Sequence, residues 1–196
     1  FGDTSRTTTR TFEDTSKWYH FVLRVDSSQS TANDRIRLYV DGDQVTSFST
    51  TNNPSQDEAA NIYTVSRDFV FGNIYGGSYY TDAYFAEVNY CDGQSYGPDT
   101  FGLTDTSTGR WIPKSLSGIT YGTNGFRLEF ANSAGQTIGD DTSGNGNDLT
   151  VTNIATTDIT TDTPTQNFVT FDPNDQGNNN GATAGTAVLS EGNLRI

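Results

Sequence analysis

The stretch AYFAEVNYCDGQSYGPDTFGLTDTSTGRW at residues 83–111, continued by YGTNGFRLEF at 121–130, decides the fold. Large apolar residues alternate with polar ones at 84–90 and again at 126–130, and this period of two indicates strands that are each buried on one face. Between these segments, Asp-Gly and Gly-Pro-Asp sequences favour turns. Two half-buried strands joined by a long, turn-rich connection are typical of a β-sandwich with structured loops.

The alternation assigns the side chains of these two predicted strands to faces. In the first strand we expect Tyr84, Ala86, Val88 and Tyr90 on one face and Phe85, Glu87 and Asn89 on the other. In the second strand we expect Phe126, Leu128 and Phe130 inward and Arg127 and Glu129 outward. No helical apolar period continues over ten residues anywhere in the chain, so the predicted class is all-β, with at most short helical turns at 98–101 and 104–109.

The strongest local pattern is a hairpin. Alternating residues at 35–40 are followed by Asp41-Gly42, a pair that tolerates the positive φ of a tight turn, and the second strand is expected at 44–48. Its inward residues are Ile36, Leu38 and Val40. Further strands are expected at 18–26, where large side chains on both faces indicate a strand covered on two sides or facing a groove, at 62–65, at 68–73 and, as an edge strand or frayed end, at 1–10.

Composition and charge narrow the classes of function. Hydrophobic residues make up 32% of the chain and aromatic residues 12%, so a core can form although turn residues are abundant. The formal net charge of −13 disfavours binding to DNA, RNA or an anionic membrane, because phosphate neutralisation needs clustered Lys and Arg. The same acidity suits solubility and cation binding. No apolar run approaches the length that inserts into a membrane.

Cys91 and His20 are each the only residue of their type. A lone cysteine cannot form an intrachain disulfide, and on a predicted strand it is interpreted as a small apolar residue, with a reactive thiol or interchain bridge as the alternative. His20 is interpreted as a strand residue, since a catalytic base needs a positioned partner and no such residue stands near it in the sequence.

Five stretches together resemble one family. They are WYHFVLRVD at 18–26, RIRLYVDGDQV at 35–45, FAEVNYCDGQSYGPDTFG at 85–102, GRWIPKSLSGITYGTNGFRLEF at 109–130 and GDDTSGNGNDLTV at 139–151. In this order they are similar to the laminin-G-like, concanavalin A-like modules of virion fibre and appendage proteins of marine bacteriophages. The resemblance implies an all-β, two-sheet antiparallel jelly-roll sandwich.

The resemblance also implies a role. We expect a structural and adhesive protein of the virion surface, outside the cell, that is not an enzyme. Its implied partners are other virion subunits, including copies of itself in a homo-oligomer, and host-surface carbohydrate, with no nucleic acid and no membrane insertion. A purely architectural module for capsid decoration or fibre assembly is the alternative.

The resemblance divides the chain into three parts. Residues 1–153 are the expected sandwich, without the first strands of the family's module. The Thr- and Asp-rich residues 154–167 are the expected linker, and residues 168–196 the start of a further β module. Because the chain holds no Met and opens within strand-like sequence, we expect it to be a piece of a longer polypeptide.

One loop is a candidate calcium site. Oxygen-bearing side chains alternate at Asp141, Ser143, Asn145 and Asn147, and the sixth position, Gly146, permits a turn, as in the first half of a calcium loop. The twelfth position is a threonine and not the bidentate glutamate of an EF-hand. The alternative is a tight turn whose side chains bond their own backbone.

A glycoside hydrolase of the same fold is the less favoured alternative. Enzymes of this fold carry a Glu-x-Asp-x-x-Glu strand, and here Glu87, Asn89 and Asp92 occupy the three acidic positions. Retaining hydrolysis needs two carboxyl groups about 5 Å apart. Since an amide replaces the middle acid and a shorter acid in an Asp-Gly turn replaces the last, we expect no catalysis.

Exposed aromatic residues on polar loops are candidates for sugar binding. Aromatic rings stack on the C–H faces of sugars, while amides and carboxylates orient hydroxyl groups. The candidates are Tyr75, Tyr79 and Tyr80 in a glycine turn, and Tyr96. Isolated exposed aromatics are also normal on protein surfaces, so the sequence leaves their role open.

Overall fold

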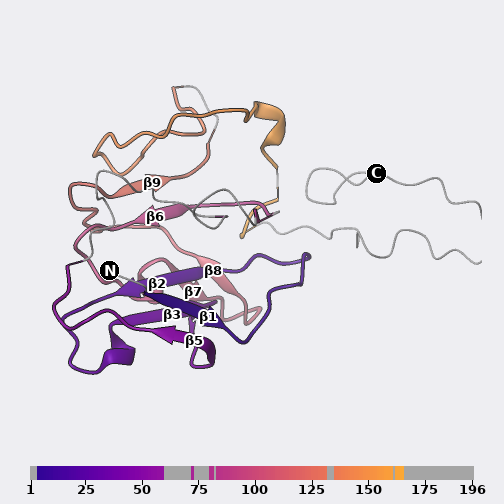
Figure 1. Ribbon diagram of the computed structural model, residues 1–196. Helices are drawn as coiled ribbons and strands as arrows, with labels where there is room; N and C mark the ends of the chain where they lie inside the picture. The colour runs from indigo at the N-terminus through magenta and orange to yellow at the C-terminus, as the bar shows by residue number, and fades with distance from the viewer. Residues whose placement is uncertain are drawn as a thin grey trace, which may run out of the picture. The chain divides into compact units, whose positions relative to one another are not determined.

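The chain is described by a computed structural model over residues 4–59, 72, 80–81, 83–131, 135–160 and 162–165. Throughout these residues the regular elements are strands and short 3-10 helices, as the all-β class requires (Figure 1). The chain divides into two compact units. Unit 1 comprises Phe1–Phe12, His20–Phe85 and Ser95–Gly102, and unit 2 comprises Glu13–Tyr19, Ala86–Gln94 and Leu103–Ile196. In the described segments, no helix has the length and apolar character to cross a membrane.

Unit 1 contains a three-stranded antiparallel sheet in the order β2-β3-β4. Strand β2 is Phe21–Val25, β3 is Ile36–Val40 and β4 is Asp43–Gln44, with the 3-10 helix η1, Ala32–Asp34, before β3. The turn after β3 is Asp41-Gly42, and both residues have positive φ, 53° and 89°. Asp tolerates this conformation and Gly adopts it without steric cost. The predicted hairpin turn is confirmed.

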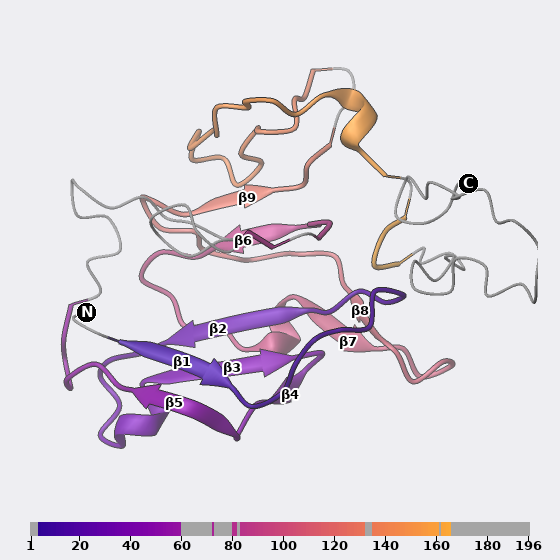
Figure 2. The same ribbon diagram turned by 45° about the vertical axis from the view of Figure 1, so that its right-hand side comes forward.

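The second sheet of unit 1 pairs β1, Ser5–Thr8, with β5, Phe48–Asn52 (Figure 2). The strand expected near the N-terminus is confirmed. The second hairpin strand, expected at 44–48, was wrong in extent, because β4 ends at Gln44 and Phe48 begins β5. Arg6 gives the physical reason: its guanidinium lies 5.0 Å from the centre of the Phe48 ring and donates to Asn53 Oδ1 at 2.6 Å. These contacts draw the segment onto β1 instead of β3.

The core of unit 1 is formed by Val22, Ile36 and Val40. Ile36 and Val40 lie inward as predicted. Strand β2, expected to be covered on two sides or to face a groove, is covered on the Val22 side, whereas Phe21 and Leu23 are 50% and 62% exposed. Large side chains on both faces locate a strand but do not say which face is covered. Cover on both sides is not seen in the described residues, and the alternative of a face toward a groove stays a prediction.

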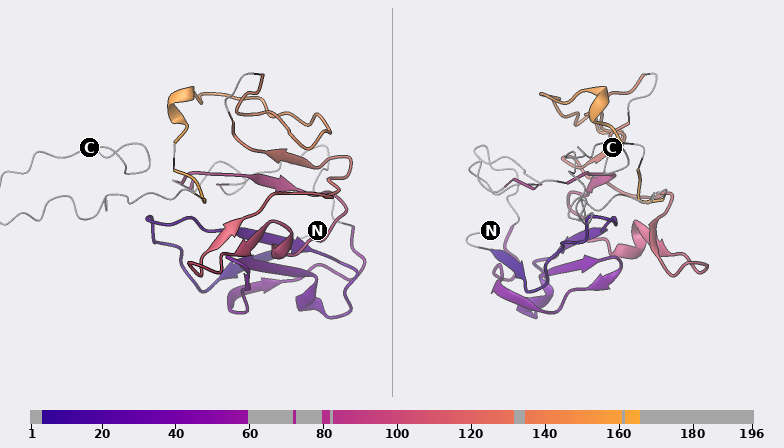
Figure 3. Two further views of the ribbon diagram at one scale, coloured as in Figure 1. Left: turned by 180° about the vertical axis from the view of Figure 1, so that it is seen from behind. Right: turned by 90° about the vertical axis from the view of Figure 1, so that its right-hand side faces the viewer.

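Unit 2 is centred on the antiparallel pair of β6, Val88–Tyr90, and β9, Phe126–Leu128 (Figure 3). Asn89 lies opposite Arg127 in this register. Leu128 is fully buried at 0% exposure, and Phe126 beside it is buried and packs against the Tyr90 ring. The inward assignment of Phe126 and Leu128 is therefore confirmed.

Both strands of this pair are shorter than predicted. Glu87 has a φ of 47° and Phe130 a φ of 53°, values outside the extended region. Glu87 lies one position beyond Val88 and Phe130 two positions beyond Leu128, and Val88–Leu128 is the last pair of the ladder. Tyr84 and Phe85, expected within the first strand, precede it and are exposed.

Strands β7, Gly102–Thr104, and β8, Trp111–Pro113, form a further pair. The helical turn expected at 98–101 is confirmed as the 3-10 helix η2, Pro98–Thr100. The helical turn expected at 104–109 is instead a turn organised by Asp105. Its carboxylate accepts from the Ser107 amide at 2.8 Å and from the Thr108 hydroxyl at 2.8 Å, and such bonds lower the pKa of Asp105 to about 2. Asp side chains commonly compete with helix in this way.

The described part of the expected linker contains one 3-10 helix, η3, Thr156–Asp158. It is also attached to its own unit, because the Trp18 indole donates to Asp162 Oδ2 at 3.0 Å. The strand predicted at 62–65, nearly all of that at 68–73, and the module start at 168–196 lie outside the described residues. The domain limits therefore stay predictions.

Gly125 has no room for a side chain. A Cβ there would overlap the Tyr121 carbonyl oxygen and would lie 2.6 Å from that of Tyr90. We expect Gly125→Ala to lower the free energy of unfolding by about 2 kcal/mol or more, since backbone atoms cannot give way as side chains do. Urea unfolding measures this. Gly97→Ala is the matched control, because nothing lies within 4 Å of its added Cβ, and an equal loss in both variants would contradict the prediction.

Candidate functional site

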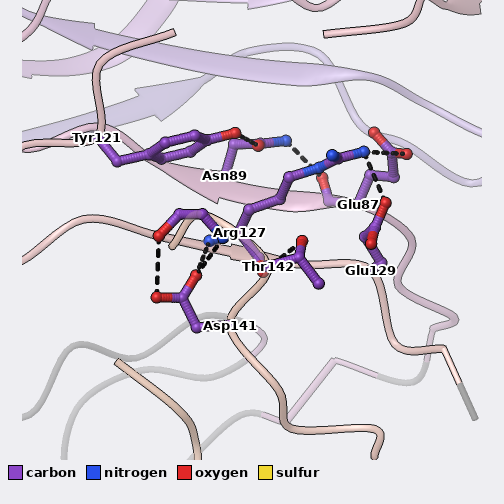
Figure 4. A network of polar contacts seen from close by, with 8 residues as sticks. Glu87, Asn89, Tyr121, Arg127, Glu129, Asp141 and Thr142 are labelled. Carbon is purple, nitrogen blue, oxygen red and sulfur yellow. Dashed lines mark hydrogen bonds and ion pairs between the residues drawn. The ribbon is translucent and has the colours of Figure 1, made fainter. Parts of the chain in front are cut away.

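The outward face of the β6–β9 pair carries a cluster of polar side chains, hereafter the polar cluster (Figure 4). Its members are Glu87, Asn89, Tyr121, Arg127 and Glu129. Residues of adjacent strands that lie opposite each other present their side chains on the same face, and the register places Asn89 opposite Arg127. Glu87 and Glu129 follow at the next position outward on each strand. The pairing of β6 with β9 thus brings together residues that are 40 positions apart in the chain.

Arg127 is the centre of the polar cluster. Its Nη2 atom lies 3.2 Å from Glu87 Oε1 and 2.8 Å from Glu129 Oε1. Figure 4 shows both carboxylates at the same end of the guanidinium, against this nitrogen. All three side chains are partly exposed, so a ligand could reach them. Two carboxylates against one guanidinium leave one negative charge without a partner inside the cluster.

Glu87 is held in an unusual backbone conformation. A positive φ in a residue with a long side chain is uncommon and costs free energy unless surrounding contacts compensate. The ion pair with Arg127 is one such contact. The conformation also ends β6, so that Glu87 stands at the rim of the sheet rather than within its ladder.

Tyr121 and Asn89 form the second part of the polar cluster. The Tyr121 hydroxyl donates to Asn89 Oδ1 at 2.8 Å. Burial raises the pKa of Tyr121 to about 12, with the charge on Arg127 opposing this rise and the charge on Glu87 adding to it. The hydroxyl therefore keeps its proton at neutral pH and fixes the orientation of the Asn89 amide, whose nitrogen makes a long contact, 3.4 Å, to the Glu87 carbonyl.

The loop that follows β9 fixes the backbone of Arg127. Asp141 Oδ1 accepts from the Arg127 amide and from the Ser143 amide, both at 2.8 Å, while Oδ2 accepts from the Asn147 amide and the Ser143 hydroxyl, both at 2.9 Å. The amide of Thr142 in turn donates to the Arg127 carbonyl. One carboxylate thus joins the loop to the strand that carries the centre of the polar cluster.

Asn145 and Asn147 extend this attachment to a neighbouring loop. Both Nδ2 atoms donate to the Gly125 carbonyl, at 2.8 and 2.9 Å, and Asn145 also donates to the Gly122 carbonyl at 2.7 Å. The alternative to a calcium site was a turn whose side chains bond their own backbone, and the bonds from the Ser143 and Asn147 amides to Asp141 are of that kind. In the described ranges no three acidic, His or Cys side chains group as metal ligands, and a cation would have to replace hydrogen bonds of Asp141. Calcium at this loop stays a prediction.

The residues of the glycosidase alternative engage separate partners. Glu87 pairs with Arg127, as described, whereas Asp92 Oδ2 accepts from Asn124 Nδ2 at 2.8 Å. Asn89 between them is an amide bound to Tyr121. A retaining hydrolase needs a nucleophilic carboxylate facing an acid across the scissile bond. The carboxylates of Glu87 and Asp92 instead each bind a nearby side chain of the fold.

The aromatic candidates are placed in different ways. Tyr80 is 75% exposed, as a sugar-stacking residue requires. Tyr96 is half-buried and packs edge-on against Phe101, with ring centres 6.3 Å apart, which indicates a packing role. Tyr75 and Tyr79 lie outside the described residues. None of the four is a member of the polar cluster.

Burial shifts the pKa values of both Cys91 and His20. Burial raises the pKa of the Cys91 thiol to about 11, so the thiol is not ionised at neutral pH and is a poor nucleophile. Burial lowers the pKa of His20, with the charge on Asp41 opposing this effect. Both observations agree with the interpretation of these residues as parts of the fold.

Arg127 and Glu129 were not named as site residues from the sequence. The alternation placed them on the polar face of their strand, as it placed Glu87 and Asn89 on that of another. The missing information was that the two strands are neighbours, with Asn89 opposite Arg127. A single sequence does not show which strands pair across 40 residues. It therefore predicts a polar face on each strand but not that the two faces lie side by side.

Comparison with known families matches residues 2–94 to a laminin-G model described as the concanavalin A-like lectin/glucanases superfamily. The match supports a concanavalin A-like domain over this segment, which contains Glu87 and Asn89, while Tyr121, Arg127 and Glu129 lie beyond it. The description names both sugar-binding and sugar-cleaving proteins. No curated protein and no solved structure matches the chain.

Asp141 gives a pH-dependent prediction. Burial raises its pKa, but hydrogen bonds from the amides of Arg127, Ser143 and Asn147 outweigh this, so the net pKa is lowered. A carboxyl group whose pKa is lower in the folded than in the unfolded protein stabilises the folded state at pH values above its unfolded pKa, which is about 3.9. This stabilisation is lost as the pH falls through the folded-state pKa. We expect Asp141→Asn to cost about 1–2 kcal/mol near neutral pH, because the loop is partly exposed, and the cost to shrink below about pH 4.

Urea unfolding of both proteins from about pH 7 to pH 3 measures this difference. Asp43→Asn is the control, because Asp43 is exposed in β4. A cost at Asp141 that stays constant over the whole pH range would contradict the role assigned to its carboxylate.

Proposed function

We propose that this chain is a non-catalytic carbohydrate-binding module of a virion appendage, and that it contacts host-surface glycans through the polar cluster. The observation that carries the proposal is the partly exposed array of Glu87, Arg127 and Glu129 beside Asn89 on one face of the β6–β9 pair. In this proposal the chain forms a two-sheet jelly-roll and is displayed on the outside of the virion.

The side chains of the polar cluster suit sugar hydroxyl groups. A hydroxyl both donates and accepts, so a sugar site needs acceptors and donors side by side. The two carboxylates supply acceptors, and the Asn89 amide supplies a donor. Arg127 uses Nη2 in its ion pairs with Glu87 and Glu129, and its guanidinium carries further N–H donors.

The polar cluster is also held in position before any ligand binds. The Arg127 side chain is fixed by two carboxylates, its backbone by Asp141 and Thr142, and the Asn89 amide by Tyr121. Fixing these groups in advance lowers the entropy cost of binding. The match to a superfamily of lectins and glucanases supports the same class of ligand.

The absence of catalysis in this proposal rests on the carboxylates. Glu87 is ion-paired with Arg127, and Asp92 accepts a hydrogen bond from Asn124, so the contacts support neither as a nucleophile facing an acid. The virion context rests on the resemblance of the five stretches between residues 18 and 151. Assembly with copies of itself and with other virion subunits belongs to the same proposal, as does the absence of nucleic-acid binding, which the net charge of −13 supports.

One observation favours the architectural alternative. Phe21 and Leu23 place two large apolar side chains on the exposed side of β2. Clustered exposed apolar residues often mark contacts between proteins. A module that only joins virion subunits would use such a surface and would retain no sugar.

Glycan binding tests the proposal. We expect the protein to retain a defined group of sugars on a glycan array, and Asn89→Ala to weaken the affinity for the retained sugar by about tenfold, the loss of about one hydrogen bond. Asn52→Ala, which removes the same group from exposed β5, is the control and should change little. Isothermal titration calorimetry measures the affinities.

The same experiment separates the other candidates. We expect binding to persist in chelator, because the polar cluster supplies the contacts without a cation. Binding that needs added calcium would assign the loop at Asp141 as the site, and binding that is lost in Tyr80→Ala but kept in Asn89→Ala would assign it to the aromatic turn. No retained sugar in any condition would sink the proposal and leave the architectural role.

A further inference from the structure

The charge of the polar cluster bears on which sugars it can hold. Each ligand group that approaches Arg127 also approaches Glu87 and Glu129, since both carboxylates contact the same Nη2 atom. The single positive charge of the guanidinium therefore faces two negative charges, and the three side chains together carry a net charge of about −1. We propose that the polar cluster prefers amino sugars that carry a free ammonium group, accepts neutral sugars more weakly and rejects acidic sugars. This inference rests on the proposed function.

An acidic sugar meets two obstacles at this site. At Nη2 of Arg127 its carboxylate or sulfate group could bind only by taking the place of Glu87 or Glu129, and at the other guanidinium N–H groups it would lie close to both carboxylates. The displaced glutamate would then remain near two other negative groups. Like charges at such separations repel, and the repulsion is strongest where water is partly excluded.

The remaining groups of the polar cluster do not offset this charge. Tyr121 is neutral at neutral pH, for the reason given above, and its hydroxyl proton is used by Asn89. The Asn89 amide is uncharged. Asp141, which lies behind the Arg127 backbone, adds a further negative charge. The protein as a whole carries a formal net charge of −13, so the long-range field has the same sign.

An ammonium group would be stabilised by the same arrangement. It could donate to Glu87 and Glu129 through the carboxylate oxygen that does not face Nη2, because each carboxylate has a second oxygen. Such charge-assisted hydrogen bonds are stronger than those between neutral groups. An amino sugar therefore gains contacts where an acidic sugar loses them.

The test uses three tetrasaccharides that share one linkage and differ in charge: β-1,4-linked glucose, glucosamine and glucuronate. We expect the dissociation constant to rise about tenfold from the amino sugar to the neutral sugar and by at least as much again to the uronate, as titration calorimetry would show. The preference for the amino sugar should weaken when salt is raised, because partly exposed charges are screened. If the site does not bind β-1,4-linked sugars, the same comparison is made on an array of amino, neutral and acidic oligosaccharides with other linkages.

Glu129→Gln is the diagnostic variant, since it removes one negative charge and leaves the shape of the side chain nearly unchanged. We expect the ratio of uronate to amino-sugar affinity to rise by about tenfold in this variant. Glu13→Gln removes the same charge from an exposed position outside the polar cluster and should leave the ratio as it is. The wild-type ranking and its salt dependence decide the question even if the variant fails to fold.

The possible results distinguish the inference from the proposed function. If no sugar of any class binds, both are overturned. If sugars bind but uronates bind as well as or better than amino sugars, the charge selectivity is overturned and the carbohydrate-binding role stands. If the ranking holds and is unchanged in Glu129→Gln, the selectivity arises elsewhere and the assignment to the polar cluster is wrong.

Discussion

Unit 2 depends on the two-sided fixation of Arg127. Its backbone is bound by the Asp141 carboxylate and by Thr142, and its side chain by Glu87 and Glu129. The next residue, Leu128, is fully buried, so the same three-residue strand supplies both the core and the polar cluster. Because side chains alternate along a strand, a contact that fixes Leu128 inward also fixes Arg127 outward. Core packing and site geometry are therefore not independent here.

The parts of the fold that the sequence predicts are those that depend on neighbouring residues. The Asp41-Gly42 turn, the strand at 36–40 and the inward faces of Phe126 and Leu128 follow from turn chemistry and from alternation over a few positions. The parts that it does not predict depend on distant partners. Arg6 draws Phe48 onto β1, and strand lengths at Glu87 and Phe130 follow from backbone conformations that no short pattern encodes.

The candidate site shows the same division. Glu87 and Asn89 stood out in the sequence because their spacing resembles a catalytic strand, and the structure gives the first an ion pair and the second a tyrosine hydroxyl instead. Arg127 supplies the missing partner from a strand 40 positions later. The Asp141 loop was singled out for its oxygen-bearing side chains. The Asp141 carboxylate accepts hydrogen bonds from the backbone amides of Arg127 and Asn147. A pattern chosen for one kind of chemistry thus has a positioning role in the described contacts.

The most direct test of the account is to locate a bound sugar on the protein. Amide and side-chain resonances of the 15N-labelled chain can be followed by NMR while the tetrasaccharide with the highest affinity is added. The account predicts that the shifts are concentrated on β6 and β9, with the side-chain signals of Asn89 and Arg127 among the largest. Shifts confined to the surroundings of Tyr80 or to the loop at Asp141, with Asn89 and Arg127 unchanged, would contradict it.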